Sequence, residues 1–286
     1  MPLLEVKNLS YTYDKGTSFS HDAINNISFS VNSGEIIGII GHTGSGKSTL
    51  VSHLNGLIKT EKGRIFVDGD DIWEDPKNIR KFRFSVGLVF QYPEYQLFED
   101  TVYKDIAFGP VNMGLDETEI KKRVLYSAKL VGLTDELLQK SPFDLSGGEK
   151  RRAAIAGVMA MQPKVLVLDE PTAGLDPVGR KLILSRIKEY RDQTNSAVII
   201  VSHSMEDMAE YADKILVLKS GEKMMFDKTE NVFSNSEMLF DCGLSVPQVT
   251  LIAEKLFNKG LIKSKKIFTV SGLRDEILKI KRNVND

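Results

Sequence analysis

The sequence predicts an α/β fold in which a mixed, mainly parallel sheet is joined by an antiparallel β subdomain and a helical subdomain. Short, strongly apolar runs alternate with helical patterns, as expected of parallel strands that are covered on both faces. A glycine-rich turn lies between one such run and a helix. The later runs end in polar residues, and the carboxyl ends of parallel strands meet at one sheet edge, where ligands bind.

Length and composition exclude several classes of protein. The 286 residues suffice for one large domain with an appendage or for two domains. With 38 Lys and Arg against 39 Asp and Glu, the net charge of -1 gives no bulk electrostatic reason to expect a nucleic-acid partner. The single cysteine, Cys242, cannot form an internal disulfide, and the N-terminus lacks a signal-peptide pattern, so we expect a reducing cytoplasm. No stretch approaches the roughly 18 apolar residues that span a bilayer, so membrane contact would be peripheral.

Two segments near the N-terminus show the partial apolar alternation of antiparallel strands. They are residues 3–9 and 24–31, and residues 63–69 read as a further strand ending in an Asp-Gly turn. Tyr13 lies just ahead of the glycine-rich turn. It is equally suited to stack on a nucleobase or to pack at a strand edge.

The glycine-rich turn predicts a phosphate site. It reads Gly41-His42-Thr43-Gly44-Ser45-Gly46-Lys47-Ser48-Thr49 and matches G-x-x-x-x-G-K-[ST] at every fixed position. Glycines let successive backbone N–H groups point inward at a helix N-terminus, whose dipole favours negative charge. The Lys47 ammonium can reach the outer phosphates, and the Ser48 hydroxyl can ligate Mg²⁺. A flexible turn before a helix is the weaker alternative.

The apolar strand at residues 85–90 ends at Gln91. An amide at this sheet edge can reach a metal or its water, although taken alone such a residue is more often a plain loop residue. The following loop, residues 92–100, is either a solvated connector or a docking surface. Because the loop carries Glu94, Glu99 and Asp100, we expect it to accept a basic helix of a partner.

A helical pattern follows. We expect one helix over residues 102–108, stopped by Pro110, and a second over residues 116–131. Ser146-Gly147-Gly148 then precede a helix at residues 153–161 and form a second anion cradle. If Ser146 were only a helix cap, the two glycines would be unexplained. A self-associating protein that presents this cradle to its partner's phosphates would explain them.

The strand at residues 165–168 delivers two adjacent carboxylates. Neighbouring strand residues point to opposite faces, so Asp169 and Glu170 cannot share one role. We expect Asp169 to hold magnesium through water and Glu170 to polarise an attacking water, the alternative being an acidic turn. The strand at residues 197–201 leads to His203. A lone histidine is usually structural, but four strands now end in polar or glycine positions that converge at one edge.

Several motifs together, in this order and spacing, resemble the nucleotide-binding subunit of an ABC transporter. They are the phosphate loop, Gln91, Leu145–Lys150, Val165–Glu170, Gly174–Asp176 and His203. The resemblance covers about residues 3–230. Three segments more narrowly resemble the ATPases of energy-coupling factor importers, in particular the second of their two ATPase types: Gly41–Gly44, Phe90–Phe98 and Asp105–Pro110.

The resemblance implies a P-loop NTPase fold of the ABC type and a division into domains. The nucleotide-binding domain would cover residues 1–235, with a helical subdomain at about 92–162, and a small C-terminal accessory or dimerisation domain would cover residues 236–286. It also implies ATP and Mg²⁺ as ligands. The implied activity is ATP hydrolysis that powers uptake of vitamins or metal ions through membrane subunits.

Roles are implied residue by residue. Those for the nucleotide and metal are phosphate binding by residues 44–49, adenine contact by Tyr13, and magnesium binding by Ser48, Gln91 and Asp169. Glu170 would be the catalytic base and His203 the γ-phosphate sensor. Ser146 to Gly148 would act in trans on the partner's nucleotide, and Asp176 would lie at the subunit interface. The family usually has Gln where this chain has Glu149, a known variation that we do not interpret as inactivation.

The implied partners are a second ABC ATPase subunit, in a heterodimer or alternatively a homodimer, a transmembrane coupling protein and a substrate-binding membrane protein. This places the chain at the cytoplasmic face of the cell membrane. The C-terminal segment, with predicted helices at residues 247–258 and 273–282, is either a cap on its own domain or a dimerisation element. Its Lys263, Lys265 and Lys266 are too few to predict a lipid site and fit a solvated face.

Two other function classes fit the sequence less well. Soluble ABC-type ATPases that act on DNA or ribosomes generally need a long coiled coil between the phosphate loop and Leu145, or two such domains in one chain, and the sequence has neither. A nucleotide-binding regulator without hydrolysis conflicts with the presence of Glu170 and His203. The transported substrate is not encoded in this chain, because recognition would lie in another one.

Overall fold

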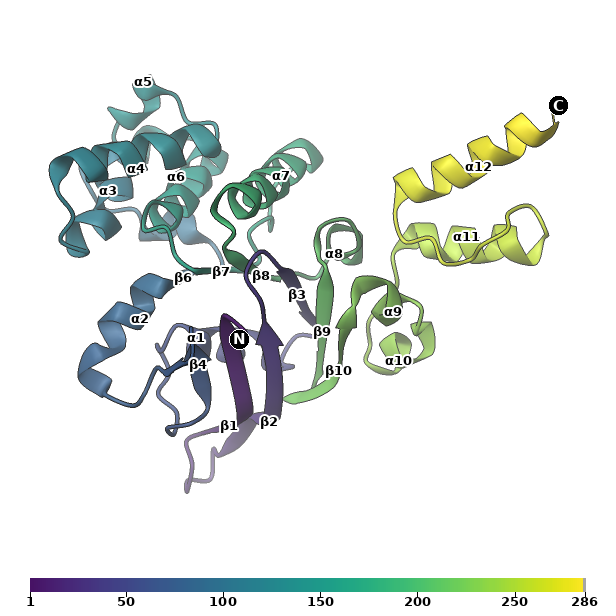
Figure 1. Cartoon of the computed structure of the whole chain (residues 1–286), viewed down its shortest axis with the longest axis horizontal. Coiled ribbons are helices and arrows are strands. Elements are labelled where there is room, and N and C mark those ends of the chain that lie inside the picture. Colours follow the sequence, from purple (N-terminus) through teal and green to yellow (C-terminus); the bar gives the residue numbers. More distant parts are fainter. Residues whose placement is uncertain (285–286) are drawn as a thin grey trace.

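The computed structural model describes residues 1–284, and its centre is a six-stranded sheet (Figure 1). The strand order is β10-β9-β3-β8-β7-β6, and β9, β3, β8, β7 and β6 run parallel. The bounds are β3 (Ile36–Gly41), β6 (Val86–Val89), β7 (Val165–Asp169), β8 (Ala197–Val201), β9 (Lys214–Lys219) and the antiparallel edge strand β10 (Glu222–Lys228). The predicted α/β class with a mainly parallel sheet is confirmed.

A second, antiparallel sheet lies below the first in Figure 1. Its order is β2-β1-β4-β5, with bounds β1 (Leu4–Tyr13), β2 (His21–Val31), β4 (Ile65–Val67) and β5 (Asp70–Asp71). Strands β1 and β2 form an antiparallel hairpin in which Tyr13 pairs with His21. Helix α1 (Lys47–Leu54) starts directly after the glycine-rich turn, and α2 (Ile79–Ser85) precedes β6.

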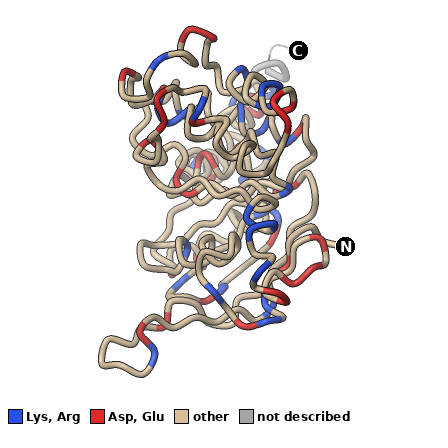
Figure 2. The backbone as a smooth tube through the Cα atoms, turned by 90° about the vertical axis from the view of Figure 1, so that its left-hand side faces the viewer, with Lys and Arg blue, Asp and Glu red and all other residues tan. Residues whose placement is uncertain are grey.

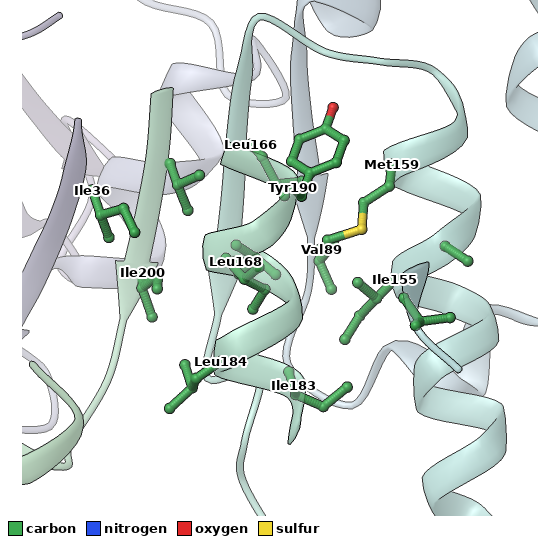
Figure 3. Close-up of a cluster of buried hydrophobic side chains, with 14 of the residues drawn as sticks. Ile36, Val89, Ile155, Met159, Leu166, Leu168, Ile183, Leu184, Tyr190 and Ile200 are labelled. Atoms are coloured by element: carbon green, nitrogen blue, oxygen red, sulfur yellow. The ribbon is translucent and has the colours of Figure 1, made fainter. Parts of the chain in front are cut away.

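Successive residues of the parallel strands point to opposite faces of the six-stranded sheet, and each face has its own hydrophobic core. Ile37, Ile39 and Val167 pack with the antiparallel sheet and α1. Ile36, Val89, Leu166, Leu168 and Ile200 of the strands belong to the core on the other side, where Figure 3 shows them with side chains of the helices: Ile155, Met159, Ile183, Leu184 and Tyr190. Strands buried on both faces explain their almost wholly apolar sequences.

The helical subdomain lies at the upper left of Figure 1. It contains α3 (Val102–Asn112), α4 (Glu117–Leu130), α5 (Asp135–Leu138) and α6 (Gly147–Ala160). The short 3₁₀ turns are η1 (Pro76–Asn78), η2 (Pro93–Gln96) and η3 (Pro142–Asp144). The prediction that Pro110 stops the first helix was wrong: α3 continues to Asn112, and a proline this close to the helix end removes only one of its last hydrogen bonds.

The remaining helices are α7 (Pro177–Thr194), α8 (Met205–Tyr211), α9 (Thr229–Phe233), α10 (Ser236–Asp241), α11 (Gln248–Asn258) and α12 (Val270–Val284). Leu239, Cys242 and Val246 pack into the main core, although they lie inside the predicted second domain. A separate small core begins at Val249 and includes Ala253, Ile262, Ile267 and Leu273. Helices α11 and α12 project at the right of Figure 1. Helix α12 begins three residues before its predicted start and runs past its predicted end.

Charges of both signs are interspersed along the tube in Figure 2, and neither sign dominates the face shown. Within residues 1–284, no helix combines the length and the apolar character that crossing a membrane requires.

Candidate nucleotide-binding and hydrolysis site

The carboxyl ends of the parallel strands and the glycine-rich turn line one pocket of about 370 Å³. Its walls contain these residues predicted from the sequence: Tyr13, Thr43, Gly44, Gly46, Lys47, Ser48, Thr49, Gln91, Asp169, Glu170 and His203. His21 and Ala23 of β2 complete the lining, and sequence reasoning missed them. The predicted antiparallel pairing could have indicated them. A strand that pairs antiparallel with β1 places its first residues beside Tyr13, the last residue of β1.

Two glycines of the glycine-rich turn have a backbone conformation that other residues rarely adopt. Gly44 and Gly46 have φ of +81° and +95°. A Cβ at Gly46 would stand 2.5 Å from the Ala23 carbonyl oxygen. Three of the predicted binding positions, Gly41, His42 and Ser45, do not line the pocket. Gly41 and Ser45 are buried beneath the turn and shape it from below.

Lys47 is held inside the turn by its own backbone. Its ammonium donates to the carbonyl oxygens of Gly41 at 2.7 Å and His42 at 3.0 Å. Burial lowers the pKa of Lys47, while the nearby carboxylates of Glu170 and Asp169 act in the opposite direction. The cation therefore already lines the pocket, and phosphate oxygens can replace the two carbonyl oxygens as its acceptors.

Three predicted magnesium ligands lie in the same pocket. The Ser48 hydroxyl donates to Asp169 Oδ2 at 3.0 Å, and Gln91 lines the wall. Burial raises the pKa of Asp169, opposed by the bond from Ser48 and the charge of Lys47. A hydroxyl, an amide oxygen and a carboxylate are the oxygen donors that Mg²⁺ prefers, so this set fits the ion. Residues 1–284 contain no cluster of three or more His, Cys, Asp or Glu that would suit another metal.

Glu170 follows β7 in a strained backbone conformation, with φ of +52°. Its side chain is 12% exposed, and burial, reinforced by the charge of Asp169, raises its pKa to about 7. Glu170 Oε1 lies 3.4 Å from His203 Nε2. Burial lowers the pKa of His203, so this contact is not a full ion pair. A carboxyl group poised near neutral pH has the basicity that general-base catalysis requires.

Tyr13, the last residue of β1, lines the same pocket. Its ring is 38% exposed and meets the Tyr11 ring edge to face, with centroids 4.9 Å apart. The Tyr13 hydroxyl lies 3.3 Å from Thr49 Oγ1. The ring thus has one exposed face that an aromatic ligand can use.

The second predicted cradle, Ser146 to Gly148, does not line the pocket. The helix behind it begins at Gly147, not at the predicted residue 153, because Ser146 caps it: Ser146 Oγ accepts from Glu149 N at 3.4 Å, and Glu149 Oε2 accepts from Ser146 N at 2.8 Å. A Cβ at Gly147 would have no neighbour within 4 Å. Neither glycine of this segment has a positive φ, so the fold of this chain does not require them.

Two acids of the loop after Gln91 pair with basic residues of this chain. Glu94 is paired with Arg151 of α6, at 3.1 and 3.0 Å, and Arg151 is only 3% exposed. Asp100 is paired with Lys104. Glu94 is therefore already paired with an internal guanidinium, and the expectation that this loop accepts a basic helix stays a prediction.

A family model described as "ABC transporter" matches residues 24–173, which include the phosphate loop, Gln91, the second cradle and both carboxylates. The chain belongs to the ABC transporter family. Within it, the chain also belongs to the energy-coupling factor ATP-binding proteins. It is 50% identical over 286 residues to "Energy-coupling factor transporter ATP-binding protein EcfA2" of Caldanaerobacter subterraneus, with 100% of both chains covered. It is 51% identical to the protein of that name from Clostridium perfringens, with 99% of each covered.

Solved structures of ABC ATPases agree with the fold. The structure of cbiO1 from Clostridium perfringens, described as part of the ABC transporter complex cbiONQ, matches with a TM-score of 0.75 and 40% identity, over 88% of this chain and 99% of that one. A dimeric ATP-binding cassette in a post-hydrolysis state, bound to ADP and Pi, matches with a TM-score of 0.70 and 27% identity, over 79% and 98%. The predicted ABC-type ATPase fold and the resemblance to energy-coupling factor ATPases are confirmed.

Proposed function

We propose that this chain binds ATP with Mg²⁺ in the pocket below Tyr13 and hydrolyses it as one of two ATPase subunits of an energy-coupling factor importer. The observation that carries the proposal is the meeting of Lys47, the Ser48–Asp169 pair and Glu170 in one pocket. Mg²⁺, when bound, would offset phosphate charge and orient the outer phosphates. Family membership supports the ATPase activity, and the geometry supports the assignment of residues.

Each residue of the pocket has a distinct role in this proposal. Tyr13 stacks on the adenine, the amides of residues 44–49 bind the phosphates, and Lys47 neutralises their outer oxygens. Glu170 accepts a proton from the attacking water, which its pKa of about 7 permits at neutral pH. His203, which lines the pocket beside Glu170, contacts the γ-phosphate.

Ser146 to Gly148 serve the nucleotide of a second ATPase subunit. The two glycines have space around them that this chain does not fill, as expected where another molecule approaches the backbone closely. Ser146 and Gly147 are exposed, at the N-terminus of the 14-residue helix α6. The similarity to a dimeric cassette supports such pairing, with Asp176 at the interface. The partner is a related subunit or a second copy of this chain.

A transmembrane coupling protein docks on the helical subdomain. A pocket of about 550 Å³ between α2, α3 and α6 is lined largely by apolar groups, among them Phe84, Phe98 and Phe108. Phe98 and Phe108 are 59% and 46% exposed. The two rings pack edge to face with centroids 5.0 Å apart and together form an exposed apolar surface. An apolar helix face of the coupling protein fits this groove better than the basic helix expected from the acidic loop.

The separate small core of α11 and α12 supports a dimerisation role for the C-terminal segment. Leu251, Ile252 and Leu278 remain 36%, 50% and 44% exposed on these two helices. An equivalent surface on the second ATPase would cover them. The chain thus sits peripherally on the cytoplasmic face of the membrane, attached through partners, while a separate membrane protein selects the vitamin or metal ion.

Replacing the proposed base tests the function. Glu170→Gln keeps the side-chain shape, so we expect ATP binding to persist while hydrolysis in the assembled complex falls by about 10²–10⁴-fold. The exposed Glu237→Gln is the matched control and should leave turnover unchanged. Near-normal hydrolysis by Glu170→Gln would reject the assigned role.

Co-expression tests the membrane part of the proposal. The chain should sediment with membranes only when the transmembrane coupling protein is co-expressed. Full activity on DNA or ribosomes without a membrane partner would instead favour a soluble ABC-type ATPase.

A further inference from the structure

Four side chains form a closed ring of contacts between β1 and α1. The Tyr13 ring meets Tyr11 edge to face at 4.9 Å between centroids, and the Tyr11 ring meets the His53 ring in the same way at 4.7 Å. Thr49 closes the ring twice: its carbonyl oxygen is 2.7 Å from His53 Nδ1, and its hydroxyl is 3.3 Å from the Tyr13 hydroxyl. The aromatic wall of the pocket is thereby tied to the helix that starts at Lys47.

His53 is an unusual residue for this buried position. It is 0% exposed, and its Nε2 has no hydrogen-bond partner among the described residues. A buried polar atom without a partner is costly, so an aliphatic side chain would fill this position at lower cost. Nδ1–H donates to the Thr49 carbonyl oxygen, which can only accept, and this bond fixes the plane of the imidazole. What histidine supplies here is therefore a ring edge held at a set angle against Tyr11.

Tyr11 contributes its ring and not its hydroxyl. Within residues 1–284 the structure records no hydrogen bond of the Tyr11 hydroxyl. Both of its aromatic contacts are edge to face, with interplanar angles of 90° and 70°, a favoured geometry for aromatic pairs. The Tyr11 ring therefore packs against the His53 ring, whose plane is fixed, and against the Tyr13 ring, whose orientation it restricts.

We propose that Tyr11 and His53 are positioning residues for recognition of the nucleotide base. They hold the Tyr13 ring in its stacking orientation at a set distance from the phosphate loop, so that base and phosphates are recognised as one unit. An exposed tyrosine at the end of β1 would otherwise lose rotational freedom when the base binds, and prior ordering removes that cost. The inference rests on the proposed function, because Tyr13 can act on a base only if the pocket takes a nucleotide.

The test compares two ligands that differ in the base. Binding of ATP and of inorganic tripolyphosphate to the full-length chain is measured by titration calorimetry with Mg²⁺. For Tyr11→Leu we expect ATP affinity to fall about fivefold while tripolyphosphate affinity is unchanged. Tyr11→Phe, which keeps the ring, should restore ATP affinity. Tyr13→Ala, which removes the stacking ring itself, should show the same selective loss.

His53 is tested with a second pair of variants. His53→Phe keeps an aromatic edge without the bond to Thr49, and His53→Leu removes both, so the selective loss of ATP affinity should be larger for His53→Leu.

Each contrary outcome has a separate meaning. Equal losses for ATP and tripolyphosphate in Tyr11→Leu would overturn the inference, because they would show general damage to α1. Unchanged ATP affinity in Tyr11→Leu, or no selective loss in Tyr13→Ala, would also overturn it. A wild-type chain that binds neither ligand would overturn the proposed function itself.

Discussion

Two glycine-containing segments of this chain, each proposed to bind phosphate, look alike in sequence and differ in structure. The phosphate loop and the segment from Ser146 to Gly148 both place glycines at a helix N-terminus. In the phosphate loop, Gly46 has φ of +95° and a Cβ there would collide with the Ala23 carbonyl. In the second segment, Gly147 is helical and a Cβ there would meet nothing within 4 Å.

The difference separates glycines that the fold requires from glycines that a ligand requires. The phosphate loop faces Asp169, Glu170 and His203 of its own chain in one pocket. The second segment lies outside that pocket and is exposed. A glycine whose replacement the chain itself would tolerate is best explained by contact with another molecule. In the proposed function, the phosphate loop therefore shares a site with residues of its own chain, and the second segment contributes to a site completed by another subunit.

The largest expected effect is the loss of ATP binding when Gly46 is replaced. In Gly46→Ala the new Cβ has no room, and φ is unfavourable for alanine, so ATP binding should weaken by at least about a hundredfold. Gly147→Ala is the matched variant. It should fold and bind ATP like wild type as an isolated chain, yet hydrolyse at least tenfold more slowly in the assembled complex, because the methyl group enters the partner's phosphate site. Calorimetry and a phosphate-release assay measure both. Weakened ATP binding by isolated Gly147→Ala would contradict the proposed role of the second segment.

A second prediction concerns the link between the two segments. Arg151, in the first half of α6, pairs with Glu94 and also donates to the Ala173 carbonyl, so it ties the second segment to the loops after Gln91 and Glu170. Arg151→Met would leave Glu94 without its cation and should lower the unfolding free energy by about 3 kcal/mol. Lys150→Met is the neighbouring control. Denaturant unfolding measures the loss, and equal stability of the two variants would show that the pair is not a structural link.

The pH dependence of Glu170 gives a third, smaller effect. Its pKa is raised from 4.5 to about 7 in the folded chain, so the ionised form destabilises the fold, and stability attributable to this group is lost as pH rises through this interval. Glu170→Gln should therefore be more stable than wild type by about 2–3 kcal/mol at pH 8, and equally stable below pH about 4.5. In the complex, wild-type hydrolysis should rise with pH around pH 7. Thermal unfolding at the two pH values measures the difference, and a gain that does not depend on pH would contradict the assigned cause.

The smallest effect concerns the cap of α6. Ser146→Ala removes the hydroxyl that accepts from Glu149 N, and should cost about 1 kcal/mol of stability. ATP affinity of the isolated chain should not change, because Ser146 lies outside the pocket. Thr134→Ala, which removes the cap of α5, is the control: it should cost similar stability and leave hydrolysis by the complex intact. Equal hydrolysis by Ser146→Ala and Thr134→Ala complexes would reduce Ser146 to a helix cap.

Much of the fold and the pocket could be predicted from the sequence, because local patterns determine them. The apolar strands end at Gly41, Gln91, Asp169 and His203, and parallel pairing alone brings these ends together. The extent of α3 through Pro110 could not be predicted, because packing in the helical subdomain outweighs one lost hydrogen bond. His21 and the Glu94–Arg151 pair depend on contacts between segments far apart in the chain, which residue spacing does not encode.

The central claim is that one chain holds a nucleotide-binding site whose hydrolytic completion needs a second subunit. The most direct test is ATP turnover by the isolated chain, at concentrations where light scattering shows a monomer, compared with turnover by the assembled complex. We predict that the monomer binds ATP and turns it over at least tenfold more slowly than the complex. A monomer that hydrolyses ATP as fast as the complex would contradict the claim.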